Sequence, residues 1–117
     1  MKTAISSFRS LVLLNAVLSC IITYVIILYN IENIDQKILL IISYALIWFY
    51  TLYKIYNFSK LGLNLYVILV VLGFILNALS DIKVYGKFYY TTSLFEHIVI
   101  GGILALSYLS KIKVKFR

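Results

Sequence analysis

The chain has 117 residues, of which 63% are hydrophobic and 13% are charged, against about 45–50% and about 25% in soluble globular domains. A soluble chain of this length would keep much of its surface in water, so the composition excludes an ordinary soluble domain and indicates a protein of the lipid bilayer. The net charge of +7 is spread over short segments, which argues against nucleic-acid binding, and the single cysteine, Cys20, excludes an intramolecular disulfide.

Four apolar runs follow one another along the chain, separated by short segments that carry most of the charges. Each run is close to the roughly 20 residues that an α-helix needs to cross about 30 Å of hydrocarbon. Strands are excluded because an open sheet would leave its edge hydrogen bonds unmade in lipid. The sequence therefore predicts an all-α, polytopic membrane protein with one domain, residues 1–117, built as an antiparallel bundle of four transmembrane helices. The predicted helices cover residues 10–30, 37–57, 61–80 and 93–110.

The first and second runs differ in length. The first has 22 uncharged residues after Arg9, and the second has 16 before Lys54. The second reaches spanning length if Lys54 extends its ammonium group to the headgroups.

Within the first run, residues 17–20 (Val-Leu-Ser-Cys) also roughly match a lipoprotein cleavage box, in which Cys20 would be lipidated. Residues 21–29 stay apolar where a mature lipoprotein normally turns polar, so a helix is the favoured interpretation.

The third and fourth runs differ in polarity. The third has 20 residues between Lys60 and Asp81, is dominated by Leu, Ile, Val and Phe, and is expected to insert unaided. The fourth carries Glu96 and His97 near its start. Ser93 and Glu96 match a capping box, which would begin this helix at residue 93. The aromatic residues at positions 85 and 88–90 would then form an interfacial belt in the preceding loop.

The basic residues indicate which helix ends lie in the cytoplasm. Eight Lys and Arg residues lie before the first helix, between the second and third, and after the fourth, whereas three lie in the other two loops. By the positive-inside rule, this places both termini on the cytoplasmic side of the cell membrane in a multi-pass topology. The tail residues would also contact anionic lipid headgroups, at about 1 kcal/mol per basic residue. These tail residues are Lys111, Lys113, Lys115 and Arg117.

Polar residues inside the predicted helices fall at a similar depth. At about 1.5 Å per residue, they lie roughly 20–24 Å from the cytoplasmic ends, with two acids above them. We hypothesise a polar layer near the outer leaflet that moves protons or binds a cation or a polar headgroup. The alternative is interhelical hydrogen bonding, worth about 0.6 kcal/mol per contact. The residues of this predicted layer are His97, Asn77, Thr23, Tyr44, Asp81 and Glu96.

Small residues predict where the helices pack. Gly101 and Ala105 form a small-xxx-small pair on the same helix face as His97, so this face is expected to point toward protein. Gly73 on the third helix and Ser19 on the first belong to two further stripes of small or polar residues.

Residues 84–90 (Val-Tyr-Gly-Lys-Phe-Tyr-Tyr) and 95–102 (Phe-Glu-His-Ile-Val-Ile-Gly-Gly) resemble the VanZ-like group of small bacterial and archaeal membrane proteins. In that group, an aromatic and acidic segment precedes a helix that carries His and then Gly-Gly. This chain departs from the pattern because Glu96 adjoins His97 and the glycines lie one residue later. The resemblance implies a membrane protein with Glu96 and His97 as its polar pair.

Two functions remain open. The favoured one is a non-catalytic membrane subunit or scaffold, which works in the lipid bilayer as a homo-oligomer or as an accessory chain of a larger membrane complex. The alternative is a small transporter or an ion- or proton-conducting protein that uses the predicted polar layer. The sequence holds no metal-ligand set, phosphate loop or nucleophile motif, so we predict no cofactor, no metal, no catalytic residue and no enzymatic activity.

Overall fold

The computed structural model describes residues 2–30, 36–79 and 87–116 and is all-helical over these ranges. It contains four α-helices, α1 (Lys2–Asn30), α2 (Gln36–Tyr56), α3 (Lys60–Leu79) and α4 (Lys87–Leu109), followed by a short 3₁₀-helix, η1 (Lys111–Lys115). The all-α prediction is confirmed. Three helices are long and apolar enough to cross a membrane over the ranges Lys2–Leu28, Ile38–Tyr56 and Lys87–Leu109. The apolar part of α3 in the described residues is shorter, Lys60–Leu76.

Two helices begin earlier than the charge pattern predicts. The first helix begins at Lys2 and α4 begins at Lys87, so Ser93 lies inside α4 and is not its N-cap. The aromatic residues 88–90 form the first turn of α4 instead of a loop. The physical reason is that a charged residue marks the edge of an apolar run, whereas a helix continues past it when the charge can reach water or headgroups.

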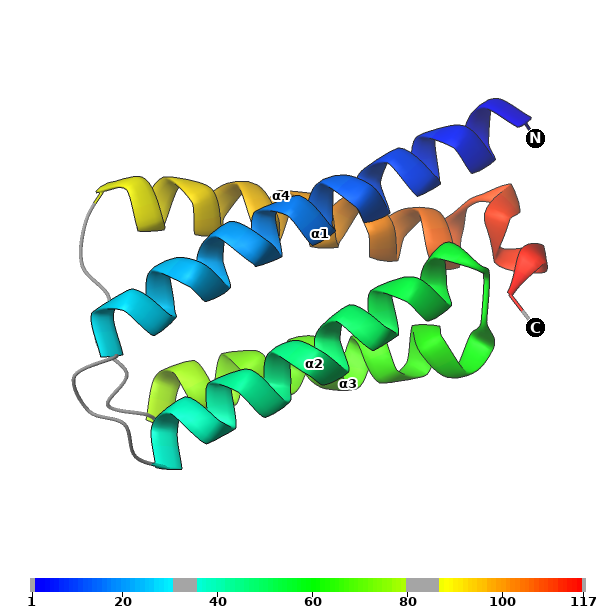
Figure 1. Cartoon of the computed structure of the whole chain (residues 1–117). Coiled ribbons are helices and arrows are strands. Elements are labelled where there is room, and N and C mark those ends of the chain that lie inside the picture. Colours follow the sequence, from blue (N-terminus) through cyan, green and yellow to red (C-terminus); the bar gives the residue numbers. More distant parts are fainter. Residues whose placement is uncertain (1, 31–35, 80–86, 117) are drawn as a thin grey trace.

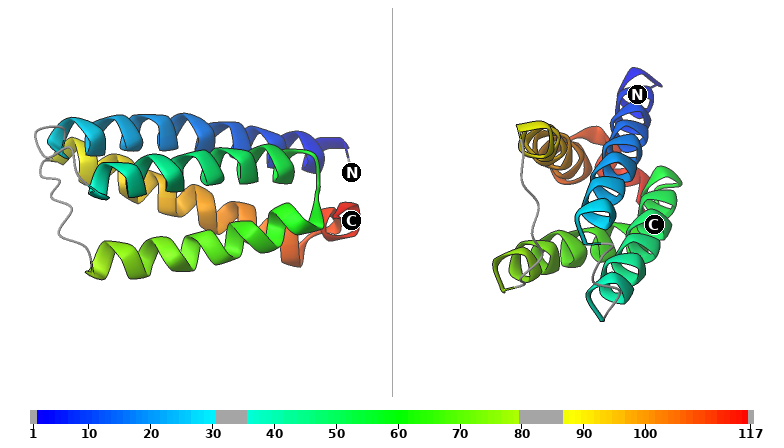
Figure 2. Two further views of the ribbon diagram at one scale, coloured as in Figure 1. Left: turned by 60° about the horizontal axis from the view of Figure 1, so that its bottom comes forward. Right: turned by 60° about the vertical axis from the view of Figure 1, so that its left-hand side comes forward.

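Consecutive helices run antiparallel, and the first and last described residues lie at the same end of the bundle (Figure 1). The first helix packs against both α2 and α4, and α2 packs against α3. The views in Figure 2 show the fourth side of the bundle, between α3 and α4, as its most open one. Among the described residues, a contact that joins these two helices is the ring pair Phe74–His97, whose centroids are 5.2 Å apart.

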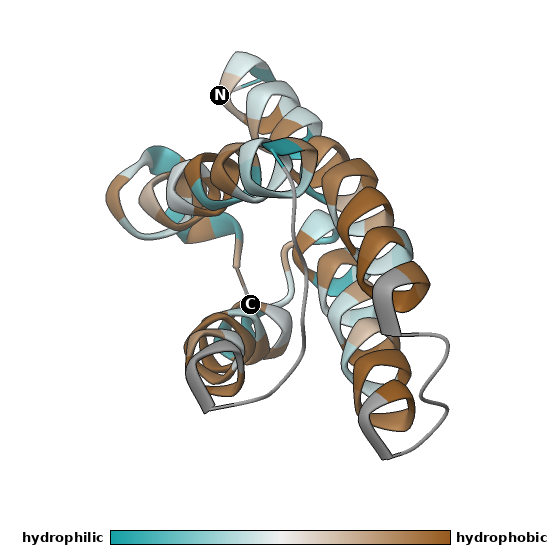
Figure 3. Ribbon diagram, turned by 90° about the vertical axis from the view of Figure 1, so that its left-hand side faces the viewer, coloured by the Kyte–Doolittle hydropathy of each residue, from teal (hydrophilic) through white to brown (hydrophobic). Residues whose placement is uncertain are grey.

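Apolar side chains cover the outside of the bundle, and polar ones occur inside it. Figure 3 shows hydrophobic residues along most of the four helices. Leu46 on α2 is 67% exposed and Ile98 on α4 is 64% exposed, whereas Asn15 and Thr51 are fully buried at 0%. A water-soluble domain would show the opposite distribution, and lipid is the solvent in which exposed apolar side chains cost nothing. This distribution is consistent with a membrane protein.

The turn between α2 and α3 brings these two helices close together. The N–H of Ser59 donates to the carbonyl of Lys54, and the N–H of Phe58 donates to the carbonyl of Ile55, which is the Schellman pattern of a helix C-terminus. Phe58 has a φ of 59°, the left-handed conformation that glycine usually supplies at this position. Ser59 then caps α3, because its side-chain oxygen accepts from the N–H of Gly62 at 3.3 Å.

Gly62 is required for this close approach. A Cβ atom at Gly62 would lie 2.5 Å from the Lys54 Cβ and 3.1 Å from the Ile55 backbone nitrogen. We expect Gly62→Ala to destabilise the fold by about 1–3 kcal/mol, because the two helices must move apart to relieve the overlap. Thermal unfolding of the purified protein in detergent, followed by circular dichroism, measures the effect.

Gly101→Ala is the matched control, because a Cβ at Gly101 would meet nothing within 4 Å. This exchange is expected to be neutral or to stabilise α4 by up to about 1 kcal/mol through helix propensity. Equal destabilisation by the two substitutions would contradict the proposed steric role of Gly62.

Candidate functional site

The first helix carries two polar side chains on its buried face. Asn15 and Ser19 are four residues apart and so share one face of α1, where they are 0% and 4% exposed. The Asn15 amide nitrogen donates to the hydroxyl of Tyr66 on α3 at 2.6 Å. The Ser19 hydroxyl lies 3.1 Å from the Asn15 amide oxygen. A polar chain therefore runs from α1 to α3 through the bundle interior.

The other two helices reach the same point. The indole Nε1 of Trp48 on α2 donates to the Ser19 oxygen at 2.8 Å. The carboxyl oxygen Oε1 of Glu96 on α4 lies 2.7 Å from the same Ser19 oxygen. Each of the four helices thus contributes to one hydrogen-bonded cluster centred on Ser19. We call this cluster the core network, and its members are Asn15, Ser19, Trp48, Tyr66 and Glu96.

Stacked aromatic rings line the core network on the side of α2 and α3. The centroids of Trp48 and Tyr66 are 5.1 Å apart, and those of Tyr44 and Trp48 are 6.2 Å apart. The Tyr44 hydroxyl donates to the backbone carbonyl of Leu69 at 2.6 Å. A Cβ at Gly73 would lie 2.7 Å from that hydroxyl, so the absence of a side chain at Gly73 admits the tip of Tyr44. These rings fill the space beside the network.

The Ser19 hydroxyl carries one proton but faces two acceptors. With Glu96 ionised, Ser19 donates its proton to the carboxylate, and the buried amide oxygen of Asn15 loses its donor within the network. With Glu96 protonated, the carboxyl group donates to Ser19, and Ser19 turns its proton to Asn15. The Ser19 oxygen then accepts from both Trp48 and Glu96, which uses both of its lone pairs. The network is therefore complete only with a proton on Glu96.

Within the described ranges, no ion pair joins Glu96 to a lysine or an arginine, and the basic group that acts on its charge is the neighbouring imidazole of His97. Glu96 is the only acidic residue in these ranges, and its partly buried carboxyl is hydrogen-bonded to Ser19. It lies roughly 14 Å along α4 from the start of that helix, close to half the thickness of a bilayer core. A carboxyl group at the middle of a bilayer would be costly, and such groups commonly mark functional sites in membrane proteins.

The structure separates the residues of the predicted polar layer. Glu96 belongs to the core network and Tyr44 stacks beside it. His97 is exposed on α4 beside the Phe74 ring of α3, and its Nδ1 lies 2.6 Å from the Ser93 carbonyl oxygen of its own helix. Thr23 is partly buried, and no hydrogen bond joins it to the other described side chains. The Asn77 side chain and Asp81 lie outside the residues described.

The predicted packing and lipid-contact residues are also distributed over different surfaces. Gly101 and Ala105 lie on the outside of the single chain, together with His97. Ser19 and Gly73 lie within the bundle, at the core network and beside Tyr44 respectively. In the tail, η1 exposes three lysines to solvent, namely Lys111, Lys113 and Lys115, and Arg117 lies outside the described residues.

Sequence analysis missed Asn15, Trp48 and Tyr66 as parts of a site. Asn15 carried a usable signal, because it is an amide within an apolar run and stands four residues before Ser19. Trp48 and Tyr66 carried none, because aromatic residues with one polar atom are equally suited to a membrane interface. Within the described residues, no group of three His, Cys, Asp or Glu side chains could hold a metal ion.

Comparison with protein-family models, with curated proteins and with solved structures finds no match to this chain. The resemblance of residues 84–102 to VanZ-like proteins therefore rests on those residues alone.

Proposed function

We propose that this chain is an integral membrane protein that conducts protons or couples transport to them, with Glu96 as the group that binds and releases the proton. The observation that carries the proposal is the Glu96 carboxyl, held 2.7 Å from Ser19 in a network of four helices without a lysine or arginine partner in the described ranges. A serine or glutamine would have served a purely structural network without the cost of a titratable group.

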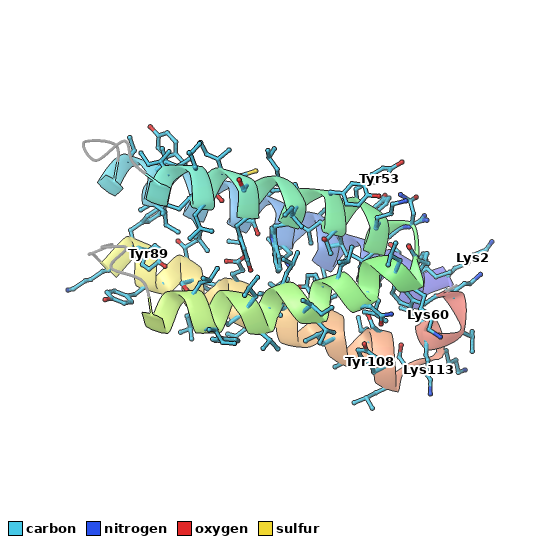
Figure 4. All side chains as sticks on the ribbon, turned by 90° about the horizontal axis from the view of Figure 1, so that it is seen from below. Lys2, Tyr53, Lys60, Tyr89, Tyr108 and Lys113 are labelled. Carbon is cyan, nitrogen blue, oxygen red and sulfur yellow. The ribbon has the colours of Figure 1, made fainter. Side chains whose placement is uncertain are left out.

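The proposal includes a topology in which all four helices cross the bilayer and both termini face the cytoplasm. It is supported by the antiparallel order of the helices (Figure 1) and by the 20 residues of α3, which span about 30 Å. Figure 4 shows Lys2, Lys60 and Lys113 at one end of the bundle and Tyr89 near the other. Basic residues gather at the cytoplasmic ends of membrane proteins.

A proton suits this site better than a larger cation. The rings beside Glu96 stack on one another at 5.1 and 6.2 Å, so they do not open a cage for an organic cation. The Ser19 hydroxyl can reverse its direction when Glu96 gains or loses a proton, which requires no movement of heavy atoms. The network therefore has two hydrogen-bonded states that differ by one proton.

Reconstitution into liposomes tests the proposed function. Vesicles with an internal pH-sensitive dye are given a pH gradient, and a potassium gradient with valinomycin sets the membrane potential. We expect the gradient to decay faster with the protein than in vesicles without it. A decay rate equal to that of the empty vesicles, at both signs of the potential, would overturn the proposal.

A second candidate function is a non-catalytic membrane subunit, either in a homo-oligomer or in a larger complex. The observation that favours it is the outer face of α4, where His97, Gly101 and Ala105 are all exposed in the single chain. Small residues permit close helix packing in lipid, and an imidazole facing hydrocarbon is costly.

A substitution on this face tests the subunit function. We expect Gly101→Leu to disrupt the assembly by filling the space that a neighbouring helix would occupy. Light scattering of the detergent-solubilised protein measures the mass of the assembly. An unchanged mass for Gly101→Leu, or a monomeric wild type that copurifies with no other chain, would remove this candidate.

A further inference from the structure

A surface hollow of about 370 Å³ lies between α1 and the end of α2, at the end of the bundle where the chain termini meet. Its volume is in the range of small-ligand sites. Two cationic side chains, two serines and a tyrosine line it, together with apolar side chains. The lining residues that matter here are Lys2, Ser6, Arg9, Ser10, Leu13 and Tyr56, and we call this hollow the Arg9 pocket.

Arg9 is held in place by the end of α2. Its Nε donates to the backbone carbonyl of Tyr56 at 3.4 Å. The guanidinium carbon lies 4.8 Å from the centroid of the Tyr56 ring and 5.3 Å from that of Phe58. Phe58 is fixed in turn by stacking on Phe8 at 5.4 Å and by an edge contact with Phe116 at 5.6 Å. The guanidinium group is therefore preorganised, with its terminal N–H groups left for another acceptor.

No such acceptor lies at this end of the bundle among residues 2–30, 36–79 and 87–116. Glu96, the one acid in the described ranges, is bonded to Ser19 in the core network. The described side chains at the end with the Arg9 pocket include Lys2, Lys60 and Lys113 (Figure 4) but no carboxylate. A partly buried guanidinium group with no anionic partner in the described part of the chain favours an anion from outside.

The pocket changes from polar to apolar along α1. Lys2, Ser6 and Ser10 are spaced four residues apart on one exposed stripe, and the Ser10 hydroxyl donates to the Ser6 carbonyl at 2.9 Å. Leu13, 56% exposed, follows one turn deeper. The distance from Lys2 to Leu13 is roughly 16 Å along the helix. A phospholipid has the same order of groups, with a phosphate at the interface and an acyl chain below it.

We propose that the Arg9 pocket binds the phosphate headgroup of an anionic phospholipid of the surrounding membrane, through Arg9 and Lys2, with an acyl chain along Leu13. This site is distinct from the predicted contact of the tail lysines with headgroups, because those lysines lie on η1 and do not line the pocket. The proposal rests on the membrane placement proposed above but not on the role of Glu96.

Native mass spectrometry of the full chain, released from non-ionic detergent micelles, tests the proposal. The protein is titrated with phosphatidylglycerol, with phosphatidylcholine of the same acyl chains, and with inorganic phosphate. We expect phosphatidylglycerol to bind most tightly and Arg9→Gln to weaken it about tenfold. Lys113→Gln is the matched control, because it removes the same charge from the same end without lining the pocket. In a micelle of non-ionic detergent there is no anionic surface for Lys113 to contact, so its effect on the bound lipid should stay within about twofold.

Lys2→Gln keeps the test decisive if Arg9→Gln fails to fold, since Lys2 is exposed. It should weaken phosphatidylglycerol binding about fivefold, because it removes one of the two cations that line the pocket. Equal losses for Lys2→Gln and Lys113→Gln, equal binding of the two lipids, or displacement of phosphatidylglycerol by millimolar inorganic phosphate would each overturn the proposal. A Glu96→Gln protein should bind the lipid normally, so failure of the proton function leaves this result interpretable.

Discussion

Glu96→Gln is expected to abolish protein-dependent proton flux in liposomes while leaving the bundle folded. The amide has nearly the same shape as the carboxyl group, and its oxygen can still accept from Ser19 at the position of Oε1. It cannot gain and lose a proton, so the two states of the core network reduce to one. The decay rate of the pH gradient should fall to that of protein-free vesicles.

Thr92→Val provides the control on the same helix. Thr92 is 8% exposed, and its hydroxyl donates to the Phe88 carbonyl within α4, outside the core network. This substitution should retain the flux of the wild type. If Glu96→Gln conducts as well as Thr92→Val, Glu96 is not the proton site. Circular dichroism and gel filtration accompany the assay, because a loss of flux is assigned to the carboxyl group only if the Glu96→Gln protein is folded.

Ser19→Ala is expected to destabilise the folded protein by about 2–4 kcal/mol. The substitution removes the centre of the core network, and Trp48 Nε1, Asn15 Oδ1 and Glu96 Oε1 each lose a partner. A single interhelical hydrogen bond in a membrane protein contributes on average about 0.6 and at most about 1.7 kcal/mol, and a buried polar group without a partner costs about 1–3 kcal/mol. Unfolding by sodium dodecyl sulfate in mixed micelles measures the free energy.

Ser107→Ala is the matched control for this effect. Ser107 is as buried as Ser19, at 1% exposed, but its hydroxyl donates only to the Ile103 carbonyl of its own helix. The serine-to-alanine exchange there should change the free energy of unfolding by no more than about 0.5 kcal/mol, because no other element loses a partner. Comparable losses at the two positions would show that the core network does not hold the helices together.

Glu96→Gln and Ser19→Ala act on the same feature, because the core network connects the helices and also holds the proposed proton site. Ser19 bonds to α2 through Trp48 and to α4 through Glu96. Substitutions can separate the structural role of the network from its proposed role in proton binding. Glu96→Gln keeps the hydrogen-bond acceptor but removes the titratable group, whereas Ser19→Ala removes the residue to which Trp48, Asn15 and Glu96 bond. If the network has only a structural role, Ser19→Ala should lower the free energy of unfolding strongly, and Glu96→Gln should leave the proton flux unchanged.

The amino-acid sequence by itself determined that the chain is helical and apolar, with four helices separated by short charged segments. These properties are local, because run length and composition set whether a segment can form a helix that satisfies its own backbone in lipid. The charge pattern placed the starts of the first and fourth helices at residues 10 and 93, whereas α1 begins at Lys2 and α4 begins at Lys87. A charged residue indicates where an apolar run ends, but it does not indicate where the backbone hydrogen bonds of the helix end.

Only the tertiary structure decided which face of each helix turns inward. On α4, the spacing of Gly101 and Ala105 predicted an inward face with His97, whereas the buried face is formed by Thr92, Val99, Ile103 and Ser107. In a soluble protein, hydropathy separates the two faces, because water lies on one side and the core on the other. In a bundle with apolar surroundings and an apolar interior, both faces look alike in the sequence. The choice between them depends on how side chains from different helices meet, as Asn15, Ser19, Trp48, Tyr66 and Glu96 do.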